Sequence, residues 1–153
     1  MECPHLERLA RGGGPTTFPC LQDPRTPLAC AECGARESVW LCVTCGALNC
    51  GRYIQAHGLM HKVSHSFIVF YYLTSRYSVM QEKNKGHFVC METSQLSVYC
   101  YECDEFVIND TSDRLLENLR TLVLTKKLTL EAEVGKLGSF KNILLCLKIF
   151  CCI

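Results

Sequence analysis

Apolar side chains recur at helical spacing in one stretch late in this chain of 153 residues. Their spacing of three or four positions predicts a helix with one apolar face, made by Leu115, Leu116, Leu119, Leu122 and Val123. Asp110, Thr111 or Ser112 stands just before this stretch, where its side chain can cap the first helical N–H groups. We expect the apolar face to pack on the rest of the domain.

Shorter elements are predicted upstream of this helix. Residues 96–108 are rich in aromatic and β-branched side chains, which favours a strand or a hairpin. Residues 51–61 predict a short helix that puts His57 and His61 one turn apart on the same face. A glycine at position 58 weakens that helix by about 1 kcal/mol, so we expect metal ligation to hold it. Residues 11–29 are typical of a loop.

Composition limits the kinds of partner. The net charge is +1, with 16 basic and 15 acidic residues, and this balance gives no basic footprint for nucleic acid. The last cysteine pair is followed by Asp104 and Glu105 rather than by a basic helix. The apolar stretch 143–153, interrupted by Lys148, is shorter than the roughly 20 residues that span a bilayer. We therefore expect a monomer that binds neither nucleic acid nor membrane, although acylation of Cys151 or Cys152 is an alternative.

Cysteines and histidines carry the strongest chemical signal. Three cysteine pairs have the two-residue gap that lets both thiolates bind one tetrahedral zinc. Six further ligands accompany them, which makes three complete sets of four: Cys3, His5, Cys30, Cys33, Cys42, Cys45, Cys50, His57, His61, His87, Cys100 and Cys103. A secreted disulfide scaffold is the main alternative. The first ten residues carry charge and no apolar run, so we expect no signal peptide and a reducing compartment, nucleus or cytoplasm.

These motifs resemble the ubiquitin-protease-type zinc finger, also called the ZnF-UBP or BUZ domain. It occurs in ubiquitin carboxyl-terminal hydrolases and in a cytoplasmic histone deacetylase. The opening residues and the stretch 106–110 are most similar to a nuclear ubiquitin-specific protease. The resemblance covers residues 1–120 and is carried by Cys3-Pro-His5, Trp40-Leu-Cys42-x-x-Cys45, Cys50-Gly-Arg-Tyr53, His57-x-x-x-His61 and Tyr99-Cys-Tyr-x-Cys103-Asp104.

The resemblance implies a small α+β domain, stabilised by three cross-braced Zn²⁺ ions, with short strands and one or two helices. All three sites would be closed structural sites without an open position for catalysis. The finger would occupy residues 1–120, and residues 121–153 would form a tail outside it. The implied ligand sets are Cys3, His5, Cys100 and Cys103; Cys30, Cys33, Cys50 and His57; and Cys42, Cys45, His61 and His87.

The resemblance also implies binding of the free C-terminus of ubiquitin, which ends in Gly-Gly. Arg52 would form charge-assisted hydrogen bonds to the terminal carboxylate. Trp40, Tyr99 and Tyr101 would wall a slot that admits only glycines. Asp104 would pair with the arginines that precede the Gly-Gly. Alternatively, Trp40 is plain core and Arg52 only stabilises thiolate charge.

One pocket position departs from the family. Phe106 stands where some relatives have a tyrosine, so one hydroxyl contact is expected to be missing.

Residues 63–81 also depart from the family. They form an apolar, aromatic insertion between His61 and His87, where compact members have a much shorter link. Exposed, such a β-prone run would favour aggregation, and we interpret it as translated intron sequence. His65 falls inside the insertion, which makes His87 the preferred ligand.

No catalytic activity is expected of this chain. A thiol protease needs a nucleophilic cysteine in a glycine- and asparagine-rich box and a partner histidine, and neither box is present. We expect a non-enzymatic binding module, a truncated form of a deubiquitinase. The alternatives are a regulatory finger that folds without binding ubiquitin and a RING-like ligase, which would bind two zinc ions.

Overall fold

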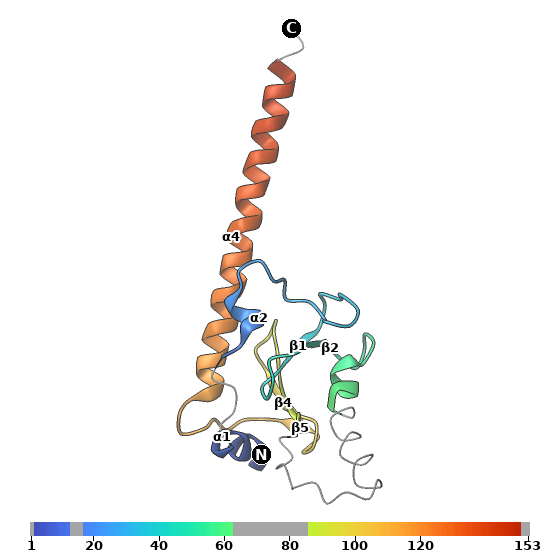
Figure 1. Ribbon diagram of the computed structural model, residues 1–153, viewed down its shortest axis with the longest axis vertical. Helices are drawn as coiled ribbons and strands as arrows, with labels where there is room; N and C mark the ends of the chain where they lie inside the picture. Colours follow the sequence, from blue (N-terminus) through green and yellow to red (C-terminus); the bar gives the residue numbers. More distant parts are fainter. Residues whose placement is uncertain (1, 13–16, 63–85, 151–153) are drawn as a thin grey trace, which may run out of the picture.

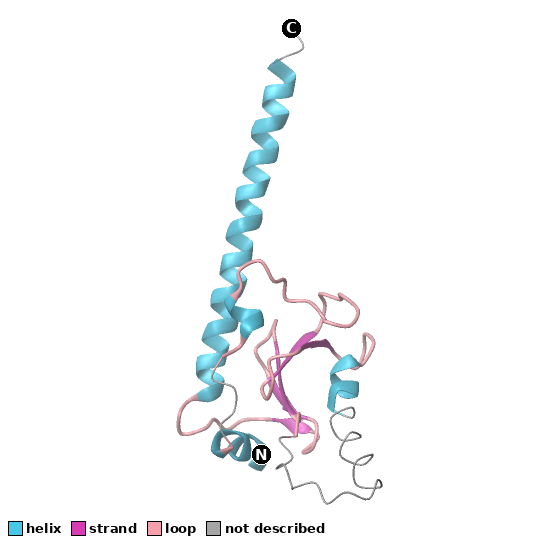
Figure 2. Ribbon diagram, viewed as in Figure 1, coloured by secondary structure: helices cyan, strands magenta, loops and turns pink. Residues whose placement is uncertain are grey.

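The computed structural model describes residues 2–12, 17–62 and 86–150, and the stretch 134–150 only as helix backbone. The insertion at 63–81, with His65, lies outside the described residues, as do Cys151 and Cys152. The fold is α+β, as expected: a small antiparallel sheet with a few helices (Figures 1 and 2). No helix among the described residues is long and apolar enough to cross a membrane.

The sheet has five strands in the order β2-β1-β3-β4-β5, and every neighbouring pair is antiparallel. Their bounds are β1 Val39–Cys42, β2 Leu48–Cys50, β3 Val89–Glu92, β4 Val98–Cys100 and β5 Glu105–Phe106. β4 and β5 form the hairpin expected between residues 96 and 108. The central position of β1 and β3 explains why both strands are almost wholly buried.

Three labelled helices surround the sheet: α1 Pro4–Arg11, α2 Pro19–Gln22 and α4 Leu115–Phe150. Prolines 4 and 19 begin α1 and α2, where a missing N–H leaves no hydrogen bond unmade. The N-terminus is tied to the segment between β5 and α4, because the backbone N–H of Cys3 donates to Asn109 Oδ1 at 2.7 Å. α4 lies against α2 and then runs on past the sheet (Figure 1).

The predicted cap of α4 is present. Asp110 accepts hydrogen bonds from the backbone N–H groups of Leu116, at 2.9 Å, and Glu117, at 3.0 Å. Thr111 Oγ1 accepts from the N–H of Leu115 at 3.0 Å. These bonds satisfy three of the four donors that a helix start leaves unpaired.

The core lies between the sheet, α1 and the first part of α4. Most members of the predicted helix face contribute to it, but Leu122 is 45% exposed and that part of the prediction is wrong. α4 continues through residue 120, the expected end of the finger, and Val123 beyond that position is fully buried. The fully buried side chains include Leu6, Val39, Leu41, Val43, Val89, Met91, Val98, Leu116, Leu119 and Val123.

The helix predicted over 51–61 begins later. Residues 52–55 form turns, and the described helical residues are 57–62. The backbone N–H groups of Ile54 and Ala56 both donate to the carbonyl oxygen of Gly51, and Ala56 has a φ of 57°. This left-handed residue stops a helix from running through it, because right-handed helices need negative φ.

Candidate functional site

The structure brings the twelve predicted metal ligands together in the three expected groups of four. Within each group, the four candidate ligand atoms lie within 4.8 Å of one another. A tetrahedral zinc with Zn–S bonds of about 2.3 Å and Zn–N bonds of about 2.1 Å sets ligand-to-ligand distances of roughly 3.4–3.8 Å. The groups are Cys3, His5, Cys100 and Cys103 (first cluster); Cys30, Cys33, Cys50 and His57 (second cluster); and Cys42, Cys45, His61 and His87 (third cluster).

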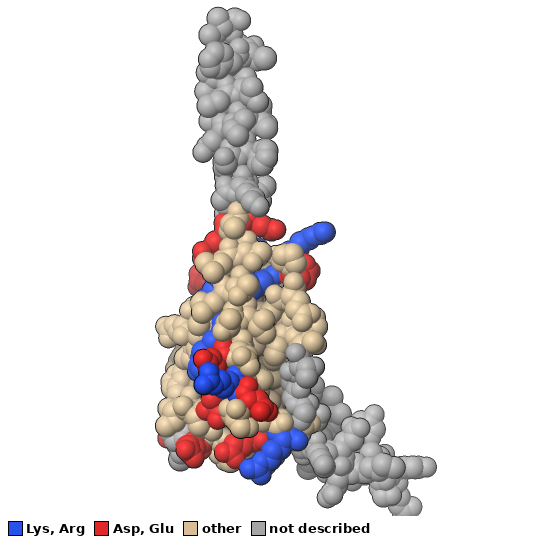
Figure 3. Space-filling model, turned by 90° about the vertical axis from the view of Figure 1, so that its left-hand side faces the viewer, with Lys and Arg blue, Asp and Glu red and all other residues tan. Residues whose placement is uncertain are grey.

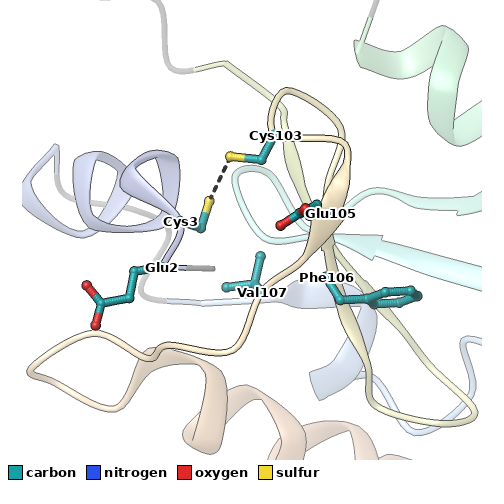
Figure 4. Close-up of a pocket in the computed structure, with 6 residues that line it drawn as sticks. All are labelled: Glu2, Cys3, Cys103, Glu105, Phe106 and Val107. Atoms are coloured by element: carbon teal, nitrogen blue, oxygen red, sulfur yellow. Dashed lines mark hydrogen bonds between the residues drawn. The ribbon is translucent and has the colours of Figure 1, made fainter.

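The first cluster joins the N-terminus to the β4–β5 hairpin. The Sγ atoms of Cys3 and Cys103 point toward each other (Figure 4) and are 3.8 Å apart. His5 Nδ1 lies 3.2 Å from Cys103 Sγ and 3.6 Å from Cys100 Sγ. These distances match the edges of a zinc tetrahedron. The distance between the Sγ atoms of Cys3 and Cys103 is also too long for a disulfide, whose S–S bond is about 2.05 Å.

The second cluster has the same dimensions. The Sγ atoms of Cys33 and Cys50 are 3.9 Å apart. His57 Nδ1 lies 3.4 Å from the Sγ atoms of both Cys30 and Cys50. Burial disfavours charge on Cys30, but hydrogen bonds from the backbone N–H groups around Cys33 lower its pKa to about 6. A thiol with such a pKa is largely a thiolate at neutral pH, which is the form that binds metal.

The third cluster is built from β1, the 57–62 helix and the start of β3. His87 Nδ1 lies 3.5 Å from Cys42 Sγ and 3.0 Å from His61 Nε2. Cys45 Sγ lies 3.3 Å from His61 Nε2. His57 and His61, one turn apart on one helix, therefore serve two different clusters. The donor set of two sulfurs and two nitrogens is one that structural zinc takes.

The turn after each cysteine pair has a left-handed residue. Gly34 and Gly46 have φ values of 71° and 75°, and their N–H groups donate to the carbonyl oxygens of the first cysteine of each pair at 2.8 Å. Asp104 occupies the same place after the third pair, with a φ of 56°. A non-glycine residue in this conformation carries a backbone cost, which points to a role for its side chain.

The five predicted ubiquitin contacts lie on one surface, although they come from three parts of the chain. Trp40 is on β1, Arg52 follows β2, and the remaining three lie on or just after β4. The rings of Trp40 and Tyr99 have centroids 6.3 Å apart, and those of Tyr99 and Tyr101 are 5.3 Å apart, both edge to face. This surface is called the aromatic pocket below: Trp40, Arg52, Tyr99, Tyr101 and Asp104.

Tyr99 is the centre of the aromatic pocket. Arg52 Nη2 donates to the Tyr99 hydroxyl at 3.0 Å, and that hydroxyl donates to Asp104 Oδ1. The guanidinium also lies 5.3 Å from the centroid of the Tyr99 ring and 3.8 Å from Asp104. Burial, followed by the bond to Asp104, raises the pKa of Tyr99, while the bond to Tyr99 raises the pKa of Arg52. The hydroxyl and the cation both keep their protons and remain donors.

Two glycines leave room for the aromatic pocket. A Cβ atom on Gly51 would lie 2.5 Å from Ser38 Oγ and 2.9 Å from Trp40 Nε1. Ser38 accepts a hydrogen bond from that indole nitrogen at 3.2 Å. A Cβ atom on Gly58 would lie 3.1 Å from the Tyr101 hydroxyl. Ser38 is not among the predicted site residues, because no local sequence pattern marks it.

The acidic residues beside Asp104 have different surroundings. Glu102 forms an ion pair with Lys62 at 3.0 Å, and the same ammonium donates to the carbonyl oxygen of Tyr101 at 3.1 Å. Glu105 and the exposed Phe106 line a shallow hollow that also touches Cys3 and Cys103 (Figure 4).

Acidic and basic side chains are intermixed over the face in Figure 3, which agrees with a net charge of +1.

Comparison with known proteins agrees with this geometry. The zf-UBP family model, described as a Zn-finger in ubiquitin-hydrolases and other protein, matches residues 30–112. Ubiquitin carboxyl-terminal hydrolase 3 of Mus musculus is 36% identical over 121 residues, which cover 78% of this chain and 22% of the relative.

More distant relatives align over shorter stretches. Ubiquitin carboxyl-terminal hydrolase 44 of Danio rerio is 35% identical over 92 residues, 60% of this chain and 10% of the relative. Histone deacetylase 6 of Caenorhabditis elegans is 34% identical over 107 residues, 70% of this chain and 8% of the relative. The chain thus spans about a fifth or less of the length of these relatives.

Proposed function

This chain belongs to the zf-UBP family of zinc fingers, and we propose that it is a zinc-dependent module that binds the free C-terminal Gly-Gly of ubiquitin. The observation that carries the proposal is the aromatic pocket. It places a guanidinium, two phenol groups and an indole around one narrow surface. Capture of a terminal carboxylate is a known mode of peptide recognition.

Zinc would supply the rigidity that this surface needs. Three Zn²⁺ ions, each held by one of the three clusters, would have four protein ligands and no open coordination position. Bound zinc contributes folding free energy of roughly 10–16 kcal/mol per structural site in small fingers. Its role here is structural, and ligand recognition falls to the protein side chains.

Arg52 would be the anchor for the terminal carboxylate. The guanidinium is already oriented by the Tyr99 hydroxyl at 3.0 Å, and its side chain is 44% exposed. It therefore has further N–H groups to offer to an incoming carboxylate. Arginine–carboxylate bonds of this kind are the stronger class of hydrogen bond, and each contributes about 1.5–3 kcal/mol.

The neighbouring rings would select for glycine. The rings of Trp40 and Tyr101 both contact Tyr99 edge to face, next to the guanidinium. A C-terminus without side chains would approach the guanidinium past these rings more easily than a bulkier one. Asp104, 82% exposed, would meet the basic residues that precede the Gly-Gly.

The proposal treats the chain as a binding module rather than a hydrolase. Every histidine that the structure describes belongs to one of the three clusters. Among those residues, no imidazole remains to activate a cysteine thiol as a nucleophile. Thiolate ligands persist in reducing compartments, so we place the chain in the nucleus or the cytoplasm. We also propose that it acts as a monomer, with ubiquitin as its partner.

The test is calorimetric titration of the zinc-loaded chain with intact ubiquitin and with ubiquitin lacking its Gly-Gly. Intact ubiquitin alone is expected to bind. Arg52→Ala should weaken that binding at least tenfold, since a charged hydrogen-bond donor is worth about 1.5–3 kcal/mol. Arg114→Ala is the matched control, because Arg114 pairs with Glu117 at the start of α4.

Two results would overturn the proposal. Equal binding of both ubiquitin forms would mean that the C-terminus is not what the chain recognises. No binding by a chain with three bound zinc ions would leave the second candidate, a finger that folds and does not bind ubiquitin. A zinc content of two would mean that one of the three clusters is not filled, since membership of the zf-UBP family excludes the RING-like alternative.

A further inference from the structure

A third thiol lies beside the two cysteines of the third cluster. Cys90 on β3 stands directly opposite Cys42 on β1. Both residues are buried, with 2% and 0% of their surface exposed. Cys90 is nevertheless not part of the candidate ligand group.

The strand register puts the two cysteines side by side on one face of the sheet. The backbone N–H of Val43 donates to Val89 at 2.9 Å, and that of Thr93 donates to Val39 at 2.9 Å. These bonds leave the Cys42–Cys90 pair at a non-hydrogen-bonded position of the antiparallel ladder, where Cα atoms approach to about 4.5 Å and side chains share one face. A disulfide accepts Cα separations of about 4.4–6.8 Å.

We propose that Cys42 and Cys90 form a reversible disulfide when the protein meets a hydroperoxide, and that the third zinc is released as a result. The inference rests on the proposed zinc ligation by the third cluster. Cys42 cannot be a thiolate ligand and a half-cystine at once. Its oxidation leaves the zinc with three ligands: Cys45, His61 and His87.

Cys45 provides the point of entry for the oxidant, because it is exposed whereas Cys42 and Cys90 are buried. Its thiolate attacks the peroxide O–O bond, which gives a sulfenic acid on Cys45 and releases an alcohol. The Cys42 thiolate attacks that sulfur, an S–S bond forms and water leaves. Cys90 then attacks the Cys42 sulfur and expels the Cys45 thiolate. Overall, two thiols lose two electrons and two protons, and the hydroperoxide is reduced to alcohol and water.

A disulfide in a reducing compartment is broken again by thiol–disulfide exchange. The same site can therefore return to the thiol form in a reducing compartment and bind zinc again. The geometry thus assigns Cys90 the role of a resolving thiol for a zinc ligand.

The experiment treats the full, zinc-loaded chain with hydrogen peroxide and follows released zinc with a chromogenic chelator. Disulfides are identified by mass spectrometry of peptides from the non-reduced protein. Cys90→Ala is compared with Cys20→Ala as a matched control. Cys20 is the other described cysteine outside the clusters, and its thiol donates to the carbonyl oxygen of Gly46 at 3.2 Å, next to the same cluster.

We expect wild type and Cys20→Ala to release one zinc ion per chain, to form a Cys42–Cys90 peptide, and to rebind zinc after treatment with a thiol reductant. Cys90→Ala should bind the same amount of zinc before oxidation and lack that peptide. It should instead keep a Cys42–Cys45 disulfide, because no third thiol is left to attack that bond.

Either of two outcomes would overturn the proposal: a Cys42–Cys45 peptide as the stable product in wild type, or formation of the Cys42–Cys90 peptide without loss of a zinc ion. The zinc content before oxidation separates this failure from failure of the ligand assignment, because a chain that starts with two zinc ions never had the third cluster filled.

Discussion

The left-handed conformation of Asp104 leads to a prediction about stability and binding at once. In the turns after the other two cysteine pairs, the equivalent residues are Gly34 and Gly46. Asp104 has a φ of 56° in the same place, and its carboxylate accepts the Tyr99 hydroxyl. We expect Asp104→Gly to keep the fold and to lose affinity for ubiquitin.

The magnitudes follow from three opposing contributions. A non-glycine residue in the left-handed region costs about 1–2 kcal/mol, and somewhat less for aspartate, which glycine would relieve. Glycine in turn loses about 0.5–1 kcal/mol more chain entropy on folding. The exposed contacts of Asp104 with Arg52 and with the Tyr99 hydroxyl together contribute about 1 kcal/mol. These terms nearly cancel, so the stability of Asp104→Gly should lie within about 0.5 kcal/mol of wild type.

Asp104→Ala is the informative comparison. Alanine loses the same carboxylate contacts and keeps the backbone strain, so it should be about 1 kcal/mol less stable than Asp104→Gly. For a domain of this size, that corresponds to a difference of about 4 °C or more in Tm. Thermal unfolding in zinc-containing buffer measures the difference, and calorimetry measures ubiquitin binding. Equal stability of the two variants would refute the backbone argument, and full affinity in Asp104→Gly would refute the role of the carboxylate.

Other parts of the structure give further predictions. Asp110→Ala removes the α4 cap and should cost about 1–2 kcal/mol in denaturant unfolding, with retained stability as the contradicting result. Leu119→Ala should cost about 2–5 kcal/mol, and Leu122→Ala less than about 0.5 kcal/mol, by the same measurement. Gly51→Ala should alter the fluorescence of Trp40, the single tryptophan, and weaken ubiquitin binding at unchanged zinc content. Chelation should abolish cooperative thermal unfolding followed by circular dichroism, and added zinc should restore it.

The groups of metal ligands could be anticipated because each set contains a cysteine pair with a two-residue gap. Such a pair fixes two of the four ligands locally. The partners of each pair come from elsewhere in the chain, and spacing alone does not assign them. Family resemblance supplied that assignment, and the structure places the same residues together: Cys3 with Cys103 and Cys45 with His61.

Helical periodicity predicted where the last helix lies in the sequence. It was a weaker guide to which side chains at the edges of the apolar face are buried. At about 100° per residue, Leu122 lies roughly 60° from Leu119, on the opposite side from Val123. The side on which the sheet packs decides which edge of the apolar face is covered. Because Val123 is buried, Leu122 is left exposed. The hydrogen bond between Arg52 and Tyr99 also depends on tertiary contact, so no local sequence pattern predicts it.

The residues of the aromatic pocket are close neighbours in the sequence of the candidate zinc ligands. Every residue of the pocket stands within two positions of a proposed zinc ligand: Trp40 before Cys42, Arg52 after Cys50, Tyr99 and Tyr101 on either side of Cys100, and Asp104 after Cys103. Zinc bound at these ligands would therefore hold the backbone of each pocket residue close to a fixed point. Strands of two to four residues offer little packing of their own for this purpose. In the proposed function, zinc ligation would let a small domain keep a guanidinium and three rings in one arrangement.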